Sequence, residues 1–136
     1  MTKVFYHHLD LYKFLFIVGI TSEDFFDGIF HKLHVEPIDT SDIASAVTVL
    51  VNIPEGEYNR KAIVCAFCIS DVMKNPLTPG IVAHEAFHAA AAIFDDVGEL
   101  VVKKDFQEPW AYLIGYLVEL IYKDIGKYVK TCKDIR

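Results

Sequence analysis

The stretch that decides the fold runs from Thr78 to Gly98 and reads TPGIVAHEAFHAAAAIFDDVG. Thr78 suits a helix N-cap, and Pro79 suits the first helical turn, where its missing N–H costs nothing. Gly98 suits the position just after a helix, where a left-handed backbone is needed. The stretch therefore predicts a helix from about Pro79 to Asp95.

Two histidines and a glutamate lie on this predicted helix in the order His84-Glu85-Ala86-Phe87-His88. Residues four apart share a helix face, so both imidazoles can reach one ion. Zinc binds His nitrogens at about 2.0–2.1 Å, and a catalytic zinc has three protein ligands and a water. Glu85 is placed to take a proton from that water. The pattern indicates a zinc hydrolase, and its alternative is two histidines packed on an amphipathic helix.

A third ligand is needed, and the spacing leaves several acidic residues open. Asp95 lies seven residues after His88, about 10 Å further along the helix axis, and is too far. Three other acidic residues lie in or near the connection after this helix, and geometry does not exclude them as ligands. A fourth lies at the start of the next helix. These four candidates are Asp96, Glu99, Asp105 and Glu108.

The stretch from His84 to Tyr116 resembles the gluzincin branch of the zincin metallopeptidases, and small zincin-like proteins of phages and prophages. In that branch the HExxH motif is followed, after nineteen residues, by a ligand glutamate, and nineteen residues separate His88 from Glu108. The resemblance implies that His84, His88 and Glu108 bind Zn²⁺ and that Glu85 is the catalytic base. Tyr112 stands where thermolysin-like enzymes have a supporting aspartate. The tyrosines at 112 and 116 are either oxyanion donors or ordinary packing residues.

The rest of the chain predicts an α+β domain in the order β-α-β-β-α-(β)-α. The metal helix is expected to pack between a small mixed sheet and a C-terminal helix that is apolar on nearly every face and therefore buried. With the resemblance, this describes a minimal zincin-like domain over residues 1–136. The other expected strands are 13–20, 44–52 and 61–70, and the loop Pro54-Glu55-Gly56-Glu57 is expected to turn the chain so that the last two form a hairpin. The other expected elements are a helix that runs from the N-cap candidates Thr21-Ser22 to about His34, a short extended piece at 99–103, and a helix from about 108 to 130.

Composition limits the class of protein. Of the 136 residues 53% are hydrophobic, which excludes a disordered chain. No apolar run approaches the ~18 residues of a membrane span, and the −6 net charge without a Lys/Arg cluster argues against nucleic-acid binding. The apolar surplus indicates either a large core or a surface for a second subunit or partner protein.

Cysteines and the remaining histidines are expected to be structural. Cys65 and Cys68 match the spacing of a zinc or redox pair, but residues three apart on a strand face opposite sides. No second pair completes a four-ligand site, so no metal or redox role is expected for them. With Cys132 they suggest reduced, buried thiols in a cytoplasmic protein. No metal role is expected for the histidine pairs at 7–8 and at 31 and 34. The strand over residues 62–69 is either a substrate-binding edge strand, as the resemblance implies, or an interior strand.

Two functions follow from the sequence. The first is a zinc metallopeptidase that hydrolyses a peptide bond through a zinc-bound water activated by Glu85. The second is a catalytically silent zinc-binding protein that acts in interaction or regulation, with phage-encoded proteins as its expected source. In a third interpretation the protein neither binds zinc nor catalyses a reaction, and the histidines are ordinary residues of the helix.

Overall fold

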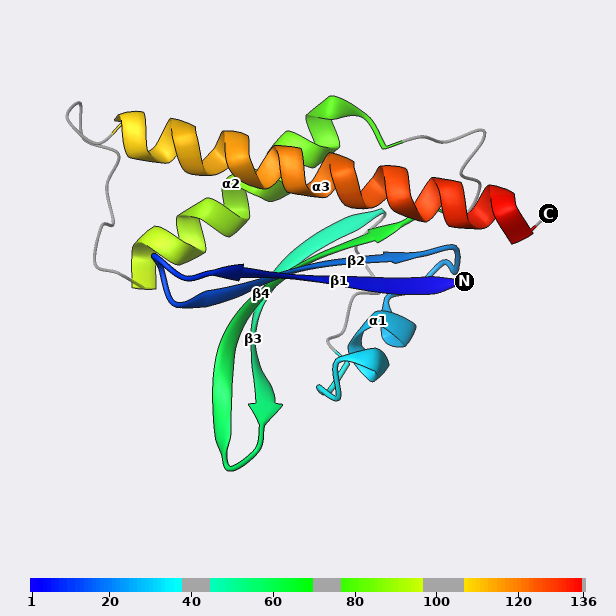
Figure 1. Cartoon of the computed structure of the whole chain (residues 1–136), viewed down its shortest axis with the longest axis horizontal. Coiled ribbons are helices and arrows are strands. Elements are labelled where there is room, and N and C mark those ends of the chain that lie inside the picture. The colour runs from blue at the N-terminus through cyan, green and yellow to red at the C-terminus, as the bar shows by residue number, and fades with distance from the viewer. Residues whose placement is uncertain (38–44, 70–76, 97–106, 136) are drawn as a thin grey trace.

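The computed structural model describes residues 1–37, 45–69, 77–96 and 107–135. In this part of the chain one four-stranded sheet packs between helices on its two faces (Figure 1). Two long helices cover one face and a short helix covers the other, which confirms the α+β class. The elements are β1 (Thr2–Leu9), β2 (Phe14–Thr21), α1 (Asp27–Lys32), β3 (Ala46–Glu55), β4 (Tyr58–Cys68), α2 (Pro79–Asp96) and α3 (Gln107–Ile135).

The strand order is β1-β2-β4-β3, and the central pair β2 and β4 is parallel. β3 and β4 form the predicted antiparallel hairpin, closed by the two residues Gly56 and Glu57 between the paired residues Glu55 and Tyr58. Gly56 has φ +61°, a conformation that favours glycine. β4 therefore has a partner on each side, so the edge-strand interpretation of residues 62–69 was wrong and the interior alternative is confirmed. The edge next to the hairpin belongs to β3.

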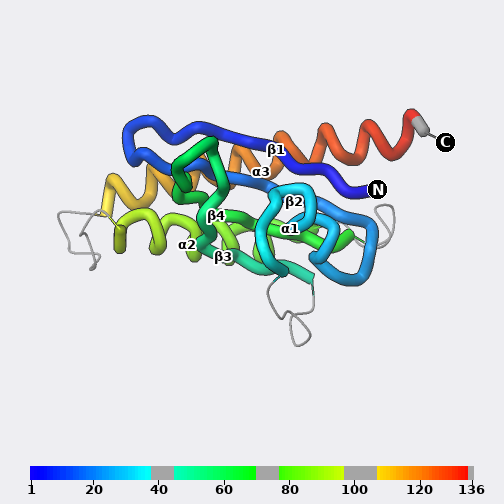
Figure 2. The backbone as a smooth tube through the Cα atoms, turned by 90° about the horizontal axis from the view of Figure 1, so that it is seen from below, coloured from blue at the N-terminus to red at the C-terminus, as the bar shows by residue number. Residues whose placement is uncertain are grey.

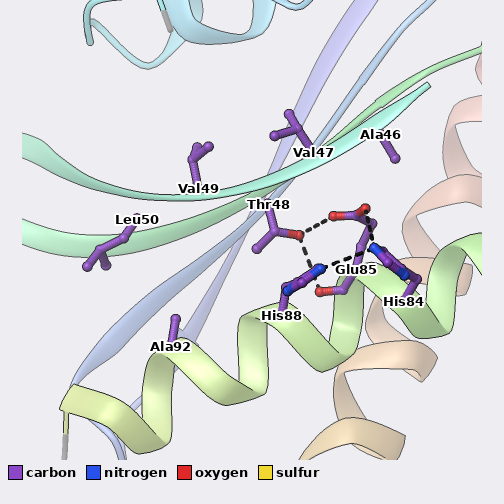
Figure 3. A pocket seen from close by; sticks show the side chains of 9 residues that line it. All are labelled: Ala46, Val47, Thr48, Val49, Leu50, His84, Glu85, His88 and Ala92. Carbon is purple, nitrogen blue, oxygen red and sulfur yellow. Dashed lines mark hydrogen bonds and ion pairs between the residues drawn. The ribbon is translucent and has the colours of Figure 1, made fainter. Parts of the chain in front are cut away.

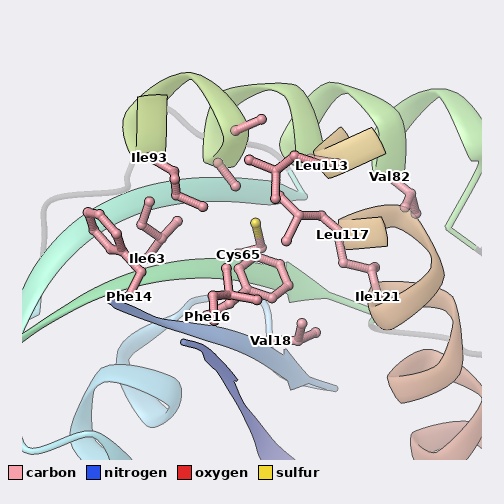
Figure 4. Packing of buried hydrophobic residues seen from close by; sticks show 14 of the residues in the cluster. Phe14, Phe16, Val18, Ile63, Cys65, Val82, Ile93, Leu113, Leu117 and Ile121 are labelled. Carbon is pink, nitrogen blue, oxygen red and sulfur yellow. The ribbon is translucent and has the colours of Figure 1, made fainter. Parts of the chain in front are cut away.

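Side chains of the two central strands point alternately to two separate cores. Phe16 and Val18 of β2 pack with α2 and α3, whereas Leu15 and Ile17 pack with α1. Figure 2 shows α1 on the near side of the sheet with α2 and α3 beyond it. Figure 4 shows residues of β2, β4, α2 and α3 meeting in the larger core. Because both faces are covered, β2 is buried along its whole length and reads as a continuous apolar run.

The N-terminal region differs from the sequence prediction in two ways. β1 was not predicted, because TKVFYHHL lies at a sheet edge and does not alternate cleanly between buried and exposed residues. The first helix begins at Asp27 instead of near Thr21-Ser22. β2 extends to Thr21, which pairs with Thr2, and its Oγ1 accepts the N–H of Glu23 at 3.2 Å. Thr21 thus closes a turn and does not cap a helix.

The C-terminal helix α3 is amphipathic, so the expectation that it is apolar on nearly every face and runs buried through the domain was wrong. Its buried residues recur every three or four positions, while Tyr112, Tyr116 and Tyr122 are exposed. Tyrosine counts as apolar in composition, but its hydroxyl favours contact with water. The buried stripe consists of Trp110, Leu113, Leu117, Ile121, Asp124 and Tyr128. None of the helices in the described ranges is long and apolar enough to cross a membrane.

The cysteines lie as the strand pattern predicted. Cys65 faces the core under α2 and α3, and Cys68 packs toward α1, so the two thiols are on opposite faces of β4. All three cysteines are free, but only Cys65 is buried, whereas Cys68 and Cys132 are partly exposed. The predicted extended piece at 99–103 lies outside the described residues.

Candidate functional site

Helix α2 carries the three motif residues on the side that faces β3 (Figure 3). The predicted helix is confirmed, and Thr78 Oγ1 accepts the N–H of Ile81 at 3.3 Å as an N-cap does. Successive helix residues are rotated by about 100°, so adjacent side chains enter different environments. The side chain of His84 is 67% exposed, whereas that of Glu85 is 7% exposed. The helix thus holds the imidazoles in solvent and the carboxylate at the sheet.

The two imidazoles point their Nε2 atoms at each other. His84 Nε2 and His88 Nε2 are 3.1 Å apart, and the ring centroids are separated by 4.6 Å. Two nitrogens bound tetrahedrally to one zinc at about 2.05 Å would lie about 3.3 Å apart. The pair therefore fits two ligands of one metal ion. The same separation also fits an N–H···N hydrogen bond between two neutral rings.

Glu85 is a nearly buried carboxyl group, and within the described ranges Thr48 is its side-chain hydrogen-bond partner. Its Oε2 lies 2.5 Å from the hydroxyl oxygen of Thr48 on β3. Its Oε1 lies 4.0 Å from His84 Nε2. A buried carboxylate is costly without hydrogen bonds, so its place on an otherwise apolar helix face needs a reason beyond packing.

A groove runs between α2 and β3 beside these residues. We call it the α2–β3 groove, with a volume of about 370 Å³, lined by residues 46–50 of β3 and by His84, Glu85, His88 and Ala92. Side chains alternate along a strand, and Val47 and Val49 point away from α2 in Figure 3. Five consecutive residues can line one groove only where the backbone edge of the strand faces it. A second hollow of about 420 Å³, toward Thr78 and Ser45, shares Ala46, His84 and Glu85 with the groove.

The predicted third ligand is not joined to the histidine pair. Glu108 is exposed in the first turn of α3, and among the described residues no group of three His, Cys, Asp or Glu could hold a metal ion. Asp96 Oδ1 forms an ion pair with Lys61 Nζ at 2.5 Å. The other two acids that the spacing left open, Glu99 and Asp105, lie outside the described residues. The structure thus brings together His84, Glu85 and His88.

Tyr112 and Tyr116 lie on α3 and do not line the α2–β3 groove. They are 75% and 50% exposed, as surface aromatic residues are. Thr48 lines the groove and was missed by sequence reasoning, and the buried Cys65 contacts Thr48 from the core. Strand alternation places Thr48 on the helix-facing side of β3 with Ala46 and Leu50, but no local pattern shows that this side meets Glu85.

The histidines outside the motif have other surroundings. His7 Nε2 pairs with Asp124 Oδ2 at 2.5 Å, which connects β1 to α3. Burial raises the pKa of Asp124, and the contact with His7 opposes that rise. His31 lies in the last turn of α1, where a helix C-terminus favours a positive charge, and His34 follows the helix; both are exposed.

Comparison with protein-family models, with curated proteins and with solved structures found no match to this chain.

Proposed function

We propose that this chain is a zinc-dependent metallopeptidase whose metal is held by His84 and His88 and whose base is Glu85. The observation that carries the proposal is the 3.1 Å separation of the two Nε2 atoms, with the Glu85 carboxylate beside them in an open groove. Two ligands on one helix turn and an adjacent carboxylate are the parts that metal-assisted hydrolysis needs.

In the proposed reaction the histidines and Glu85 have separate roles. Zinc bound there would lower the pKa of a water toward ~7 and polarise a carbonyl oxygen. Glu85, whose Oε1 is directed to the histidine side, takes the proton of the attacking water and delivers it to the leaving amine. Its burial removes competing water from the carboxylate.

The free edge of β3 supports a peptide as substrate. Within the described ranges β3 pairs only with β4, so the N–H and C=O groups on its other side have no strand partner. That edge borders the α2–β3 groove, where an extended peptide would add as a further strand and pass the histidine pair. Glu108 remains our proposal for the third ligand, because it lies in the first turn of the helix that packs beside α2.

Metal binding is tested with tag-free protein that is stripped by a chelator and titrated with Zn²⁺. We expect one equivalent of zinc, lost in His84→Ala and His88→Ala and kept in the matched exposed-histidine variant His31→Ala. Glu108→Ala should weaken zinc binding while Glu119→Ala on the same helix does not. Uptake below a tenth of an equivalent by the wild type would overturn every zinc-based function.

Catalysis is tested with a diverse peptide library and mass-spectrometric detection of products. Glu85→Gln should keep zinc and lose at least ~10²-fold in cleavage rate, since removing a general base has that effect. Equal cleavage by the wild type and by Glu85→Gln would refute the role of Glu85.

A second candidate, a zinc-binding regulatory protein without catalysis, is favoured by one observation. Glu108 is exposed and does not complete a three-residue ligand group with the histidines among the described residues. This alternative predicts stoichiometric zinc, no cleavage of any library member, and identical behaviour of the wild type and Glu85→Gln.

A further inference from the structure

Thr48 has an unusual place on β3. The neighbouring residues on the same strand face, Ala46 and Leu50, are apolar, while Val47 and Val49 pack toward the core under α1. Figure 3 shows Thr48 directed at the Glu85 carboxylate across the gap between strand and helix. A β-branched residue suits a strand, so strand formation at this position does not require the hydroxyl. The hydroxyl is what distinguishes Thr48 from the valines beside it.

The hydrogen bonds around this hydroxyl have a fixed direction. Thr48 Oγ1 donates to Glu85 Oε2 at 2.5 Å, which is closer than the Glu85 main-chain oxygen at 3.3 Å, and a hydroxyl has one proton to donate. Cys65 Sγ lies 3.3 Å from Thr48 Oγ1 and 3.8 Å from the main-chain oxygen of Glu85. Burial raises the pKa of Cys65 to about 12, so its thiol keeps its proton and acts as the remaining donor of the cluster.

This arrangement gives the two oxygens of Glu85 different roles. Oε2 is held by Thr48 at the sheet, and Oε1 lies on the side of His84 Nε2, 4.0 Å away. A carboxylate without the Thr48 contact could rotate about its last bond, because that torsion is broad. Proton transfer requires one oxygen within hydrogen-bond reach of the water.

We propose that Thr48 is the positioning residue of this site: its hydroxyl fixes the Glu85 carboxylate so that Oε1 faces the histidine pair. The proposal rests on the proposed function for its effect on catalysis. The geometry on which it depends involves only Thr48, Glu85 and His84, and it can be measured without activity.

The kinetic experiment compares Thr48→Val, which has the same shape without the hydroxyl, with Thr48→Ser, which keeps the hydroxyl. With zinc content equal in all proteins, we expect Thr48→Val to lower kcat about tenfold or more, because a misplaced catalytic group can cost ~10² in rate. KM should change less than about twofold, since the change affects the transition state and not substrate binding. Thr48→Ser should recover most of kcat, and Thr131→Val on α3 should match the wild type.

The second readout is the conformation of Glu85 in high-resolution structures of zinc-loaded wild type and Thr48→Val. We expect one carboxylate orientation in the wild type and a rotated or divided orientation in the variant. Thr48→Ala provides a second removal of the hydroxyl if the valine variant does not fold.

The outcomes separate the two proposals. If the wild type cleaves peptides and Thr48→Val cleaves equally fast with Glu85 unmoved, the positioning role is overturned and the metallopeptidase stands. If the wild type cleaves nothing but Glu85 reorients in Thr48→Val, the positioning role stands and the metallopeptidase fails. A loss of kcat that Thr48→Ser does not recover also overturns the role assigned to the hydroxyl.

Discussion

Gly19→Ala is the substitution for which the structure gives the sharpest stability prediction. Gly19 lies in β2 under helix α1, and a Cβ placed there would be 2.5 Å from Ile29 Cγ2 and 3.1 Å from Ile29 Cδ1. Carbon atoms in contact normally lie about 3.5–4.0 Å apart, so the methyl group is about 1 Å too close. Ile29 is fully buried and β-branched, so it cannot turn its Cγ2 aside cheaply.

The expected loss follows from two opposing contributions. Overpacking of this kind costs about 1–3 kcal/mol. Replacing glycine by alanine reduces the entropy of the unfolded chain and offsets about 0.4–1 kcal/mol. We therefore expect Gly19→Ala to lower the free energy of unfolding by about 1–2 kcal/mol. Urea unfolding followed by circular dichroism measures this difference.

A double-mutant cycle identifies the cause. Ile29→Ala removes the contacting atoms and costs about 2–5 kcal/mol alone, but in that background Gly19→Ala should no longer destabilise. Ile29→Val keeps Cγ2 and should not rescue. Gly126→Ala on α3, where no atom of the described residues lies within 4 Å of the added Cβ, should stabilise the protein. The reasoning would be refuted if Gly19→Ala were as stable as the wild type. It would also be refuted if Gly19→Ala lowered the free energy of unfolding of the Ile29→Ala protein as much as that of the wild type.

Two further predictions concern buried titratable groups. Burial raises the pKa of Asp124 above its ordinary value of about 3.9, so the folded state binds more protons, and stability falls as pH rises from about 4 through the folded-state pKa. Asp124→Asn should remove this decline in urea unfolding over the pH range, and the exposed control Asp10→Asn should keep it; an unchanged slope in Asp124→Asn would contradict the assignment. The thiol of Cys65, with its pKa raised to about 12, should resist iodoacetamide at about pH 8 in the folded protein and react after unfolding. Peptide mapping by mass spectrometry checks this, and rapid labelling of Cys65 in the native state would show that its burial is wrong.

Local sequence signals predicted those parts of the fold that depend on local physics. The N-cap at Thr78, the proline at 79 and the turn at Gly56 fix elements through their own backbone requirements, and each is found as expected. The alternation of a strand likewise placed Cys65 and Cys68 on opposite faces. Such features need no knowledge of distant neighbours.

The errors share a different physical origin. Which strand lies at the edge depends on pairing between β2 and β4, more than forty residues apart, and no local pattern in either strand reports it. The sequence around Thr21 predicted a helix cap, because its pairing with Thr2 of β1 is not visible in the local pattern. The exposed tyrosines of α3 looked apolar because composition does not show which face meets the sheet.

The candidate site also combines local features, which the sequence predicts, with long-range contacts, which it does not. His84, Glu85 and His88 could be read from the sequence because one helix turn brings them together. Thr48 could not, because its contact with Glu85 spans 37 positions and depends on how closely α2 approaches β3. The third ligand is the remaining long-range question, and the zinc titration of Glu108→Ala addresses it.

The alanines on the buried face of α2 have a consequence for how this site tolerates change. Ala86, Ala89 and Ala90 are fully buried between the helix and the rest of the larger core. Their methyl groups act as spacers that fix the separation between α2 and the sheet. A larger side chain at any of them would move the helix outward and lengthen the Thr48–Glu85 contact, although none of the three borders the groove. Substitutions that enlarge this core are therefore expected to alter the site geometry together with stability.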